Sequence, residues 1–540
     1  MSVVDAREWW RSAAIYQVYP RSFADGNGDG IGDLAGIRAR LGYLAGLGVD
    51  AIWFSPWFPS PMADAGYDVA DYRDIDPAFG TLAEAEALIA EAHELGIRTI
   101  VDIVPNHCSS EHAWFREAVA AGPGSAAREL FWFRDGRGVD GQLPPNNWQS
   151  IFGGSAWSRV ADGQWYLHLF APQQPDFNWE NPKVREEFED ILRFWFSRGV
   201  DGIRIDSVAV VMKDPLLADF DPANPPSPHP YVDRDELHEI YRGWRAVADS
   251  YPQPRALIGE IWLPDTERFI RYLRPDELHT AFNFDFLGRP WDAAQLRESI
   301  DTTLAAHAPV HAPATWVLSN HDVTRHVTRY GRADTGYDMD LRGQRHLLPT
   351  DLALGTRRAR AAALLAMALP GSVYLYQGEE LGLVEVEDMP DALRQDPMYH
   401  RSGGTNPGRD GCRVPLPWSG TTPPFGFSPD NAAGQPWLPQ PATWATSTVE
   451  AESADPDSML TLYRRALAVR HSESGLGDGP MTWLASDPQV LAFHRGPRFA
   501  CLVNLGQTPA DLPAHEGVLV ASGPLTDGRL PTDTAVWLQL

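Results

Sequence analysis

A carboxylate lies close to a fixed positive charge in segment 199–207 of the chain. Arg204 and Asp206 are two residues apart, so in a β-strand their side chains point to the same face. A guanidinium beside an aspartate favours the ionised form of that carboxylate. An ionised carboxylate at the C-terminal end of a strand is a candidate nucleophile, although an isolated pair of this kind is more often an ordinary surface ion pair.

Other polar residues with chemical potential follow apolar segments. Glu260 ends the run 256–259, where burial would let it keep a proton at neutral pH, as a general acid requires. Asp322 follows His321 at the end of the run 315–320. His107 ends the run 101–106, where it could donate a hydrogen bond to a substrate hydroxyl or could be purely structural.

The three carboxylates and two histidines together indicate glycoside cleavage. One carboxylate would attack the anomeric carbon and a second would protonate the leaving oxygen. The third could hold the ring hydroxyls and help to distort the sugar. A metal site is the alternative use of histidines and aspartates, but the chain lacks the H-x-H and H-E-x-x-H spacings.

Strand-like runs must carry these residues to one place. Between residue 13 and about residue 380 such runs alternate with amphipathic, helix-like segments. The predicted strands are 14–20, 49–56, 97–104, 200–206, 255–261, 281–286, 315–320 and 372–377. This order predicts an α/β fold, a closed (β/α)8 TIM barrel, whose active sites lie at the C-terminal ends of the strands. An open doubly wound sheet is the alternative, but no glycine-rich phosphate loop follows the first strand.

Insertions and a tail complete the predicted organisation. The segment after strand 3 is too long for a plain loop and is rich in Pro, Gly and Trp, which predicts an inserted subdomain. The tail opens on a helix and continues as short strands separated by turns, which predicts a C-terminal antiparallel β-sandwich. The predicted boundaries are 1–105 and 177–458 for the barrel, with rim insertions near 326–359 and 385–439, 106–176 for the subdomain and 459–540 for the sandwich.

A glycine-rich acidic loop follows the first predicted strand. Oxygen-bearing side chains at alternate positions of such a loop can surround a hard cation such as Ca²⁺ or Mg²⁺. The loop opens like an EF-hand loop, but Gly36 stands where that motif has its bidentate Glu, and a solvated acidic turn is the alternative. The predicted metal residues are Asp25, Asn27, Asp29, Ile31 and Asp33. We expect a structural divalent cation away from the chemistry, and no organic cofactor.

Composition limits the partners and the compartment. A net charge of −27 argues against nucleic acid and anionic membranes and suits a neutral ligand. Three distant cysteines do not form a disulfide framework and agree with a reducing compartment. The chain has no apolar run of the roughly 18–20 residues that span a bilayer and no signal-peptide core at its start. We therefore expect a cytoplasmic protein, with its oligomeric state unknown.

The sequence resembles the α-amylase superfamily, glycoside hydrolase family thirteen. Segments 102–107, 202–206, 260 and 320–322 are similar to its four signature blocks. Segment 174–179, Gln-Pro-Asp-Phe-Asn-Trp, looks like the block that marks the oligo-1,6-glucosidase and α-glucosidase branch. Segments 15–23 and 25–33 also look typical of that branch, so the resemblance covers almost the whole chain.

The resemblance implies a role for each residue that matches a family motif. Asp206 would be the nucleophile, Glu260 the acid/base and Asp322 the transition-state stabiliser. The residues implied to bind glucose are Arg204, His107 and His321 around the ring, Asp64 and Tyr67 at the closed non-reducing end, and Phe152 and Phe170 as aromatic walls. The family pairs the aspartate of the closed end with an arginine of the late insertion, for which Arg409 is a better match than Arg413.

A closed pocket would release single glucose units, so the resemblance implies a retaining exo-acting α-glucosidase acting on a small oligosaccharide or disaccharide. In this branch the residue after the nucleophile tends to be Val in 1,6-specific enzymes and Thr or Ala in 1,4-specific ones. Ser207 matches neither pattern and favours α-1,4 substrates such as maltose, or a broad range. The alternatives are a glucosyltransferase or isomerase such as a trehalose or isomaltulose synthase, a sucrose hydrolase, and a non-catalytic relative that would need a membrane anchor.

Overall fold

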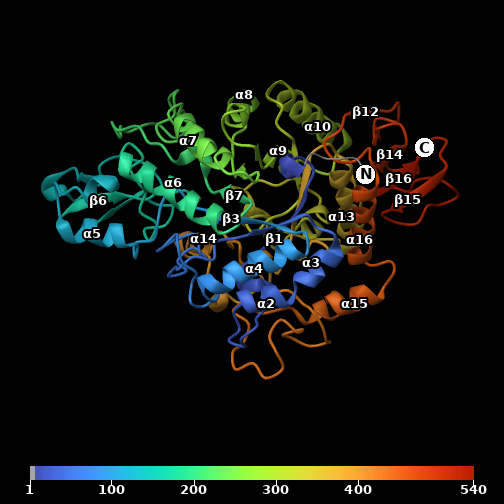
Figure 1. Cartoon of the computed structure of the whole chain (residues 1–540), viewed down its shortest axis with the longest axis horizontal. Helices are drawn as coiled ribbons and strands as arrows, with labels where there is room; N and C mark the ends of the chain where they lie inside the picture. Colours follow the sequence, from blue (N-terminus) through green and yellow to red (C-terminus); the bar gives the residue numbers. More distant parts are fainter. Residues whose placement is uncertain (1–5) are drawn as a thin grey trace.

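A parallel eight-stranded sheet curls into a barrel at the centre of the molecule (Figure 1). The computed structural model describes residues 6–540. Around the barrel the strand order is β10-β11-β1-β2-β3-β7-β8-β9. These strands are β1 (Ala14–Val18), β2 (Ala51–Phe54), β3 (Arg98–Ile103), β7 (Gly202–Ile205), β8 (Ala256–Gly259), β9 (Thr280–Ala281), β10 (Thr315–Val317) and β11 (Ser372–Tyr376). The predicted α/β barrel is confirmed.

The side chain of Thr315 bridges the two ends of the strand order. Its hydroxyl donates to the carbonyl of Ala281 at 2.6 Å and accepts from the backbone N–H of Asn283 at 3.1 Å. The predicted strand 281–286 is wrong beyond Ala281, because the Asn283 side chain accepts from the backbone N–H of Phe286 and caps helix α9 (Phe284–Gly288). A local cap therefore decides where this short strand ends.

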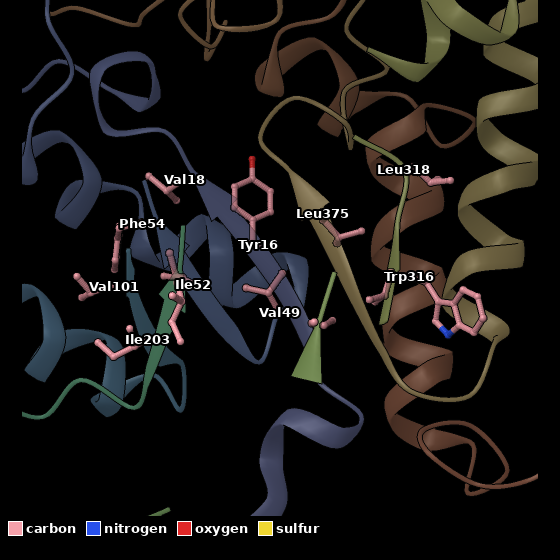
Figure 2. Close-up of a cluster of buried hydrophobic side chains, with 14 of the residues drawn as sticks. Tyr16, Val18, Val49, Ile52, Phe54, Val101, Ile203, Trp316, Leu318 and Leu375 are labelled. Atoms are coloured by element: carbon pink, nitrogen blue, oxygen red, sulfur yellow. The ribbon is translucent and has the colours of Figure 1, made fainter. Parts of the chain in front are cut away.

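Alternate residues of the barrel strands face opposite sides, as the pleat requires. The inward residues form one buried cluster that includes Ile15, Trp53, Ile100, Ile258 and Tyr374. The outward residues form a second cluster against the helices, in which Tyr16, Ile52, Phe54, Val101, Ile203 and Leu375 take part (Figure 2). Near the C-terminal rim the inward positions become polar at Gln17, Asp102 and Arg204, all of them buried. The apolar barrel core therefore ends in a charged layer beneath the rim.

Helices cover the outside of the barrel. In α4, Thr81 and Glu84 form a capping box, and α6 begins at Pro182 behind an Asn181 cap. The helices that follow the barrel strands are α2 (Leu34–Ala39), α3 (Leu41–Leu47), α4 (Leu82–Glu94), α6 (Pro182–Ser197), α7 (Leu237–Asp249), α8 (Thr266–Phe269), α10 (Ala293–His307), α11 (His326–Tyr330) and α13 (Leu352–Ala368). Short helices α1 (Pro20–Phe23), α12 (Arg342–Arg345), α14 (Pro397–Arg401) and α15 (Val449–Ala454) lie in the connections. Within residues 6–540, every helix is too short or too polar to cross a membrane.

The predicted subdomain segment folds beside the barrel, at the left of Figure 1. It contains α5 (Ala113–Ala121) and an antiparallel sheet of β4 (Phe133–Asp135), β6 (Gln164–Leu167) and β5 (Trp157–Arg159). Its own buried cluster includes Trp132, Trp148, Trp157 and Leu169, together with Leu217 from the loop after β7. The subdomain is therefore packed against a loop that belongs to the barrel rim.

The C-terminal strands form one antiparallel sheet, at the right of Figure 1. After α16 (Met459–Ser472) the order is β12 (Met481–Trp483), β13 (Val490–Arg495), β14 (Phe499–Asn504), β16 (Thr534–Gln539) and β15 (Gly517–Ala521). One face packs on the barrel helices, where the Trp537 indole N–H donates to the carbonyl of Leu364 in α13 at 3.1 Å. The other face is covered by Leu512 and Leu530 of the β14–β16 region. The predicted C-terminal antiparallel domain is therefore a single five-stranded sheet, with barrel helices on one face and the loops between β14 and β16 on the other.

Candidate active site

A cavity of about 290 Å³ opens at the C-terminal rim of the barrel. Its lining includes Asp64, Tyr67, His107, Phe152, Phe170, Asp206, Ser207, Glu260, Trp262, Asp322 and Arg409. The other two residues predicted to bind substrate, Arg204 and His321, are buried against these residues. The fold thus brings all the predicted catalytic and substrate-binding residues to one cavity, from strand ends, the subdomain and the late insertion.

Arg204 of β7 lies between the two carboxylates that the sequence assigns to catalysis. Its Nη1 donates to Asp206 Oδ1 at 2.8 Å, and its Nη2 pairs with Glu260 Oε2 at 2.9 Å. The same Nη1 also donates to Asp102 Oδ1 of β3 at 2.8 Å. Asp102 accepts further hydrogen bonds from Trp53 Nε1 and from the Tyr67 hydroxyl. One buried guanidinium therefore holds one oxygen of each of the two carboxylates.

Burial and charge separate the proton affinities of these carboxylates. Burial raises the pKa of Asp206 to about 6, although the Arg204 guanidinium opposes the shift. Burial raises the pKa of Glu260 to about 7, where Arg204 again opposes it and the charges of Asp206 and Asp322 add to it. Between these two pKa values Asp206 is ionised and Glu260 carries a proton. That is the division of labour between a nucleophile and a general acid.

Two donors on the loop side hold the Glu260 carboxyl. The backbone N–H of Ser207 donates to Glu260 Oε2 at 2.9 Å, and Trp262 Nε1 donates to Glu260 Oε1 at 3.0 Å. Ser207 adopts a left-handed conformation with φ of 50°, which few residues other than glycine take up readily. This conformation turns the backbone after Asp206 so that its N–H reaches the neighbouring strand end.

Asp322, which follows β10, lies beside two arginines and a histidine. Its Oδ1 accepts from Arg409 Nη1 at 3.1 Å and from Arg413 Nη2 at 2.8 Å, and His321 Nε2 lies 3.3 Å from Oδ2. Burial would raise the pKa of Asp322, but His321 and the two arginines outweigh it and hold the pKa well below its usual range. Asp322 is therefore ionised throughout the range in which Asp206 and Glu260 titrate.

An ion pair joins two lining residues at the end of the cavity that the resemblance predicts to be closed. Arg409 Nη2 donates to Asp64 Oδ1 at 2.7 Å. Gln174 Nε2 donates to Asp64 Oδ2 at 3.0 Å and lies 3.0 Å from His107 Nε2. The Tyr67 ring stacks on the His321 ring with centroids 5.2 Å apart. Of the two arginines weighed from the sequence, Arg409 contacts both Asp64 and Asp322, whereas Arg413 contacts Asp322.

Two phenylalanines of the subdomain line the same side. The Phe152 and Phe170 rings meet edge to face at 5.4 Å, and the Arg409 guanidinium lies 5.1 Å from the Phe152 ring. The Phe170 ring also packs against His107 at 4.8 Å. Apolar ring faces of this kind suit the C–H faces of a sugar.

A buried ion pair joins the subdomain to the barrel behind this wall. Lys213 Nζ lies 2.8 Å from Asp176 Oδ2, and both side chains are fully buried. The same ammonium donates to Asn106 after β3 and to the carbonyl of Val210, which lines the cavity. Burial lowers the pKa of Lys213, and the Asp176 carboxylate opposes that shift. The pair therefore links three chain segments that form the cavity wall.

Several residues around the cavity were not among the predicted site residues. Asp102 was detectable as a lone acid within an apolar strand, and Gln174 lies in a segment noted for its resemblance but was given no role. Trp262 has no local signal beyond its place two residues after Glu260. Asp396, which contacts Arg409, sits in an insertion without any periodic pattern.

The predicted metal loop lies apart from the cavity lining. Asp25 accepts from the backbone N–H groups of Gly28 and Gly30 at 2.6 and 2.9 Å. Asp33 accepts from Gly36 N–H at 2.6 Å and caps α2. Both carboxylates are buried, whereas Asn27 and Asp29 of the same loop are exposed. Its oxygen donors are of the type that Ca²⁺ and Mg²⁺ bind, yet residues 6–540 hold no group of three or more His, Cys, Asp or Glu side chains arranged for a metal ion.

Comparison with known proteins relates this geometry to a family. The family model described as "Alpha amylase, catalytic domain" matches residues 17–479. The chain is 40% identical over 533 residues to a probable alpha-glucosidase of Rhizobium meliloti (strain 1021), an alignment that covers 93% of this chain and 90% of that one. It is 35% identical over 530 residues to an oligo-1,6-glucosidase of Heyndrickxia coagulans, covering 90% of each. The crystal structure of an alpha-glucosyl transfer enzyme superposes with a TM-score of 0.84 at 37% identity, over 98% of this chain and 99% of that one.

Proposed function

Because the chain belongs to the alpha-amylase family of glycoside hydrolases, we propose that it is a retaining, exo-acting α-glucosidase. The proposed substrates are short α-glucosides, from which it hydrolyses the terminal non-reducing glucose, with maltose-type α-1,4 linkages favoured. The names of the relatives, a probable alpha-glucosidase and an oligo-1,6-glucosidase, support this choice.

The proposed reaction has two steps. In the first, an Asp206 oxygen bonds to the anomeric carbon, the glycosidic C–O bond breaks, and the leaving oxygen takes the Glu260 proton. In the second, Glu260 removes a proton from water, which attacks the anomeric carbon and releases Asp206. The observation that carries the proposal is the Arg204 bridge to both carboxyls combined with the higher pKa of Glu260. Asp322 is ionised and would stabilise positive charge that develops on the sugar ring.

The closed end of the cavity supports an exo mode of attack. The Asp64–Arg409 pair, with the Phe152 ring beside it, would leave no room for further sugar units beyond the non-reducing glucose. The same charged groups offer hydrogen bonds to the hydroxyls of a single glucose. Cleavage would then release one glucose in each cycle.

Trapping with a 2-deoxy-2-fluoroglucosyl fluoride tests the nucleophile. Peptide mass spectrometry should find the label on Asp206, and Asp206→Ala should lose several orders of magnitude in turnover with unchanged folding. The first product seen by NMR should be α-glucose, as expected of carboxyls about 5–5.5 Å apart. A label on another side chain, or near-normal turnover by the alanine variant, would overturn the proposal.

Glucosyl transfer on the same intermediate is the second candidate. It is favoured by the close superposition on an alpha-glucosyl transfer enzyme. In transfer or isomerisation, as in trehalose or isomaltulose synthesis, a sugar hydroxyl would replace water in the second step, and sucrose hydrolysis would use the same two carboxyls. Chromatography of the products from maltose, isomaltose, sucrose and trehalose distinguishes them: free glucose as the main product indicates hydrolysis, and new disaccharides indicate transfer.

We also propose that the loop of Asp25, Asn27, Asp29, Ile31 and Asp33 binds a structural Ca²⁺ or Mg²⁺. The alternating oxygen donors of the loop support this assignment. Because the loop does not line the cavity, its cation would stabilise the fold without taking part in the reaction. A cytoplasmic location is likewise proposed from the sequence.

A further inference from the structure

Asp396 is a buried carboxylate just behind the closed end of the cavity. It lies in the late rim insertion, directly before α14, and is only 2% exposed. It is absent from the cavity lining, whereas two residues that it contacts, Arg409 and Met398, line the cavity. Asp396 can therefore act on the site only through its neighbours.

Its main neighbour is the arginine that closes the cavity. Asp396 Oδ2 accepts from Arg409 Nε at 2.6 Å and from the Arg409 backbone N–H at 2.7 Å, and Oδ1 accepts from Arg409 Nη2 at 3.2 Å. Contact with both Nε and Nη2 is a fork-like arrangement, which fixes the plane of a guanidinium as well as its position. Burial opposes ionisation of Asp396, but Arg409 and Arg413 hold its pKa below the usual range.

Asp396 and the two cavity carboxylates contact different parts of one guanidinium. On the cavity side, Nη2 donates to Asp64 and Nη1 to Asp322. On the far side, Asp396 accepts hydrogen bonds from Nε and also from Nη2. Without the far-side charge, Arg409 would be balanced only by the two carboxylates that must bind sugar hydroxyls. The Asp396 carboxylate therefore attracts the guanidinium in the direction opposite to Asp64 and Asp322.

The surrounding backbone holds Asp396 itself in place. Its Oδ1 caps α14 by accepting from the backbone N–H of Met398 at 2.8 Å. Its own N–H donates to Asp410 Oδ2 at 3.0 Å. Gly408 has a φ of 73°, and a Cβ there would lie 2.7 Å from the Asp396 Cβ. The absence of a side chain at Gly408 lets the Arg409 segment close onto Asp396.

We propose that Asp396 is a positioning residue that orients Arg409, and through it Asp64 and Asp322, for binding the terminal glucose. This inference rests on the proposed function, because it takes the cavity to be a glucose pocket. Asp396 would affect how tightly the pocket holds a glucose-shaped ligand, without touching that ligand. Asp396 would thus be a positioning residue that lies outside the cavity wall.

Asp396→Asn tests the inference, since Asn has the same shape but must turn an N–H₂ group towards one of the donors that Asp396 accepts from. Calorimetry with 1-deoxynojirimycin measures ligand binding without turnover, and maltose kinetics give kcat and KM separately. We expect binding about tenfold weaker and kcat/KM lower by about tenfold to a hundredfold, in line with the cost of misplacing a positioning group by about 1 Å. KM should change more than kcat.

Glu387→Gln is the matched control. Glu387 is also an acid of the rim insertion that pairs with an arginine, Arg332, but it does not line the cavity. It should lower thermal stability to a similar extent and leave inhibitor binding within twofold of the parent. Equal loss of binding in both variants would mean that Asp396 is merely structural and would overturn the inference.

A double-mutant cycle with Arg409→Gln separates a direct from an indirect role. If Asp396 acts through Arg409, adding Asp396→Asn to Arg409→Gln should change inhibitor binding by less than twofold. Multiplying losses would refute the assignment. If the parent itself fails to bind the inhibitor, the glucose pocket is wrong and the inference falls with it, whereas binding by the parent and equally by Asp396→Asn overturns the inference alone.

Discussion

The hydrogen bond from Trp262 to Glu260 makes a prediction about the pH profile. The profile of kcat/KM should be bell-shaped, because the reaction needs Asp206 ionised and Glu260 protonated, with limbs near their pKa values of about 6 and about 7. Trp262→Phe removes the indole N–H that lies 3.0 Å from Glu260 Oε1. That donor stabilises the ionised form of Glu260 more than the protonated form. Its loss should therefore raise the pKa of Glu260 and move the alkaline limb to higher pH.

The size of the shift follows from the strength of the bond. A hydrogen bond to a charged group contributes about 1.5–3 kcal/mol, and one pKa unit corresponds to about 1.4 kcal/mol. The alkaline limb should move up by about 1–2 units. At pH 8 the parent, in which Glu260 has a pKa of about 7, should retain about a tenth of its maximal kcat/KM. The variant should retain about half of its own maximal kcat/KM, or more. The acid limb should stay in place, because Trp262 has no hydrogen bond to Asp206.

The assay is the initial rate of glucose release at low maltose concentration from pH 4.5 to 9.5. Phe284→Leu is the control, because Phe284 stacks on the Trp262 ring at 3.7 Å but makes no hydrogen bond to Glu260. This variant should keep both limbs where the parent has them. An alkaline limb that stays fixed or moves to lower pH in Trp262→Phe would refute the reasoning, as would an equal shift of both limbs.

Three further changes have expected outcomes. Lys213→Met should lower the free energy of unfolding by about 3–5 kcal/mol in a urea titration, because it leaves the buried Asp176 carboxylate without its cationic partner. The double variant Lys213→Met/Asp176→Leu should recover much of this loss. A loss in the double variant that equals or exceeds that of Lys213→Met would contradict the reasoning. Ser207→Val should raise kcat/KM for isomaltose relative to that for maltose. It should also lower the free energy of unfolding by about 1–2 kcal/mol, because a branched side chain is disfavoured at a φ of 50°. An unchanged ratio of the two kcat/KM values would show that Ser207 does not set the linkage preference. Chelation with EDTA should lower the melting temperature, and addition of Ca²⁺ or Mg²⁺ should restore it. In Asp29→Ala the melting temperature should no longer respond to EDTA. A melting temperature of the parent that EDTA does not change would argue against the cation.

The carboxylates of the site were detectable in the sequence because of a simple geometric rule. Parallel strands of a barrel all end at one rim, so Asp206, Glu260 and Asp322 could be assigned to one place without knowing any contact between them. The runs of apolar residues also predicted where the barrel strands lie, and both faces of these strands are buried. Where a local cap competes with this pattern, as Asn283 does, the prediction of the strand was wrong.

Contacts between distant segments decided what the chain order left open. Arg409 and Arg413 were both candidates to meet Asp64, and only folding of the late insertion brings Arg409 to 2.7 Å from it. Asp396 had no sequence signal, because its partner lies across an irregular loop. The pKa order of Asp206 and Glu260 likewise depends on burial and on Arg204, a single cation shared by both.

Residue type and strand register thus determine which groups can do chemistry and at which rim of the barrel they stand, since both follow from local periodicity. Which of those groups is charged, which is protonated and which arginine pairs with Asp64 are set by distances between segments that lie tens to hundreds of residues apart in the sequence. Electrostatic energies depend on such distances and on the exclusion of water. The close approach of these groups and their burial are established only when the insertions pack over the barrel.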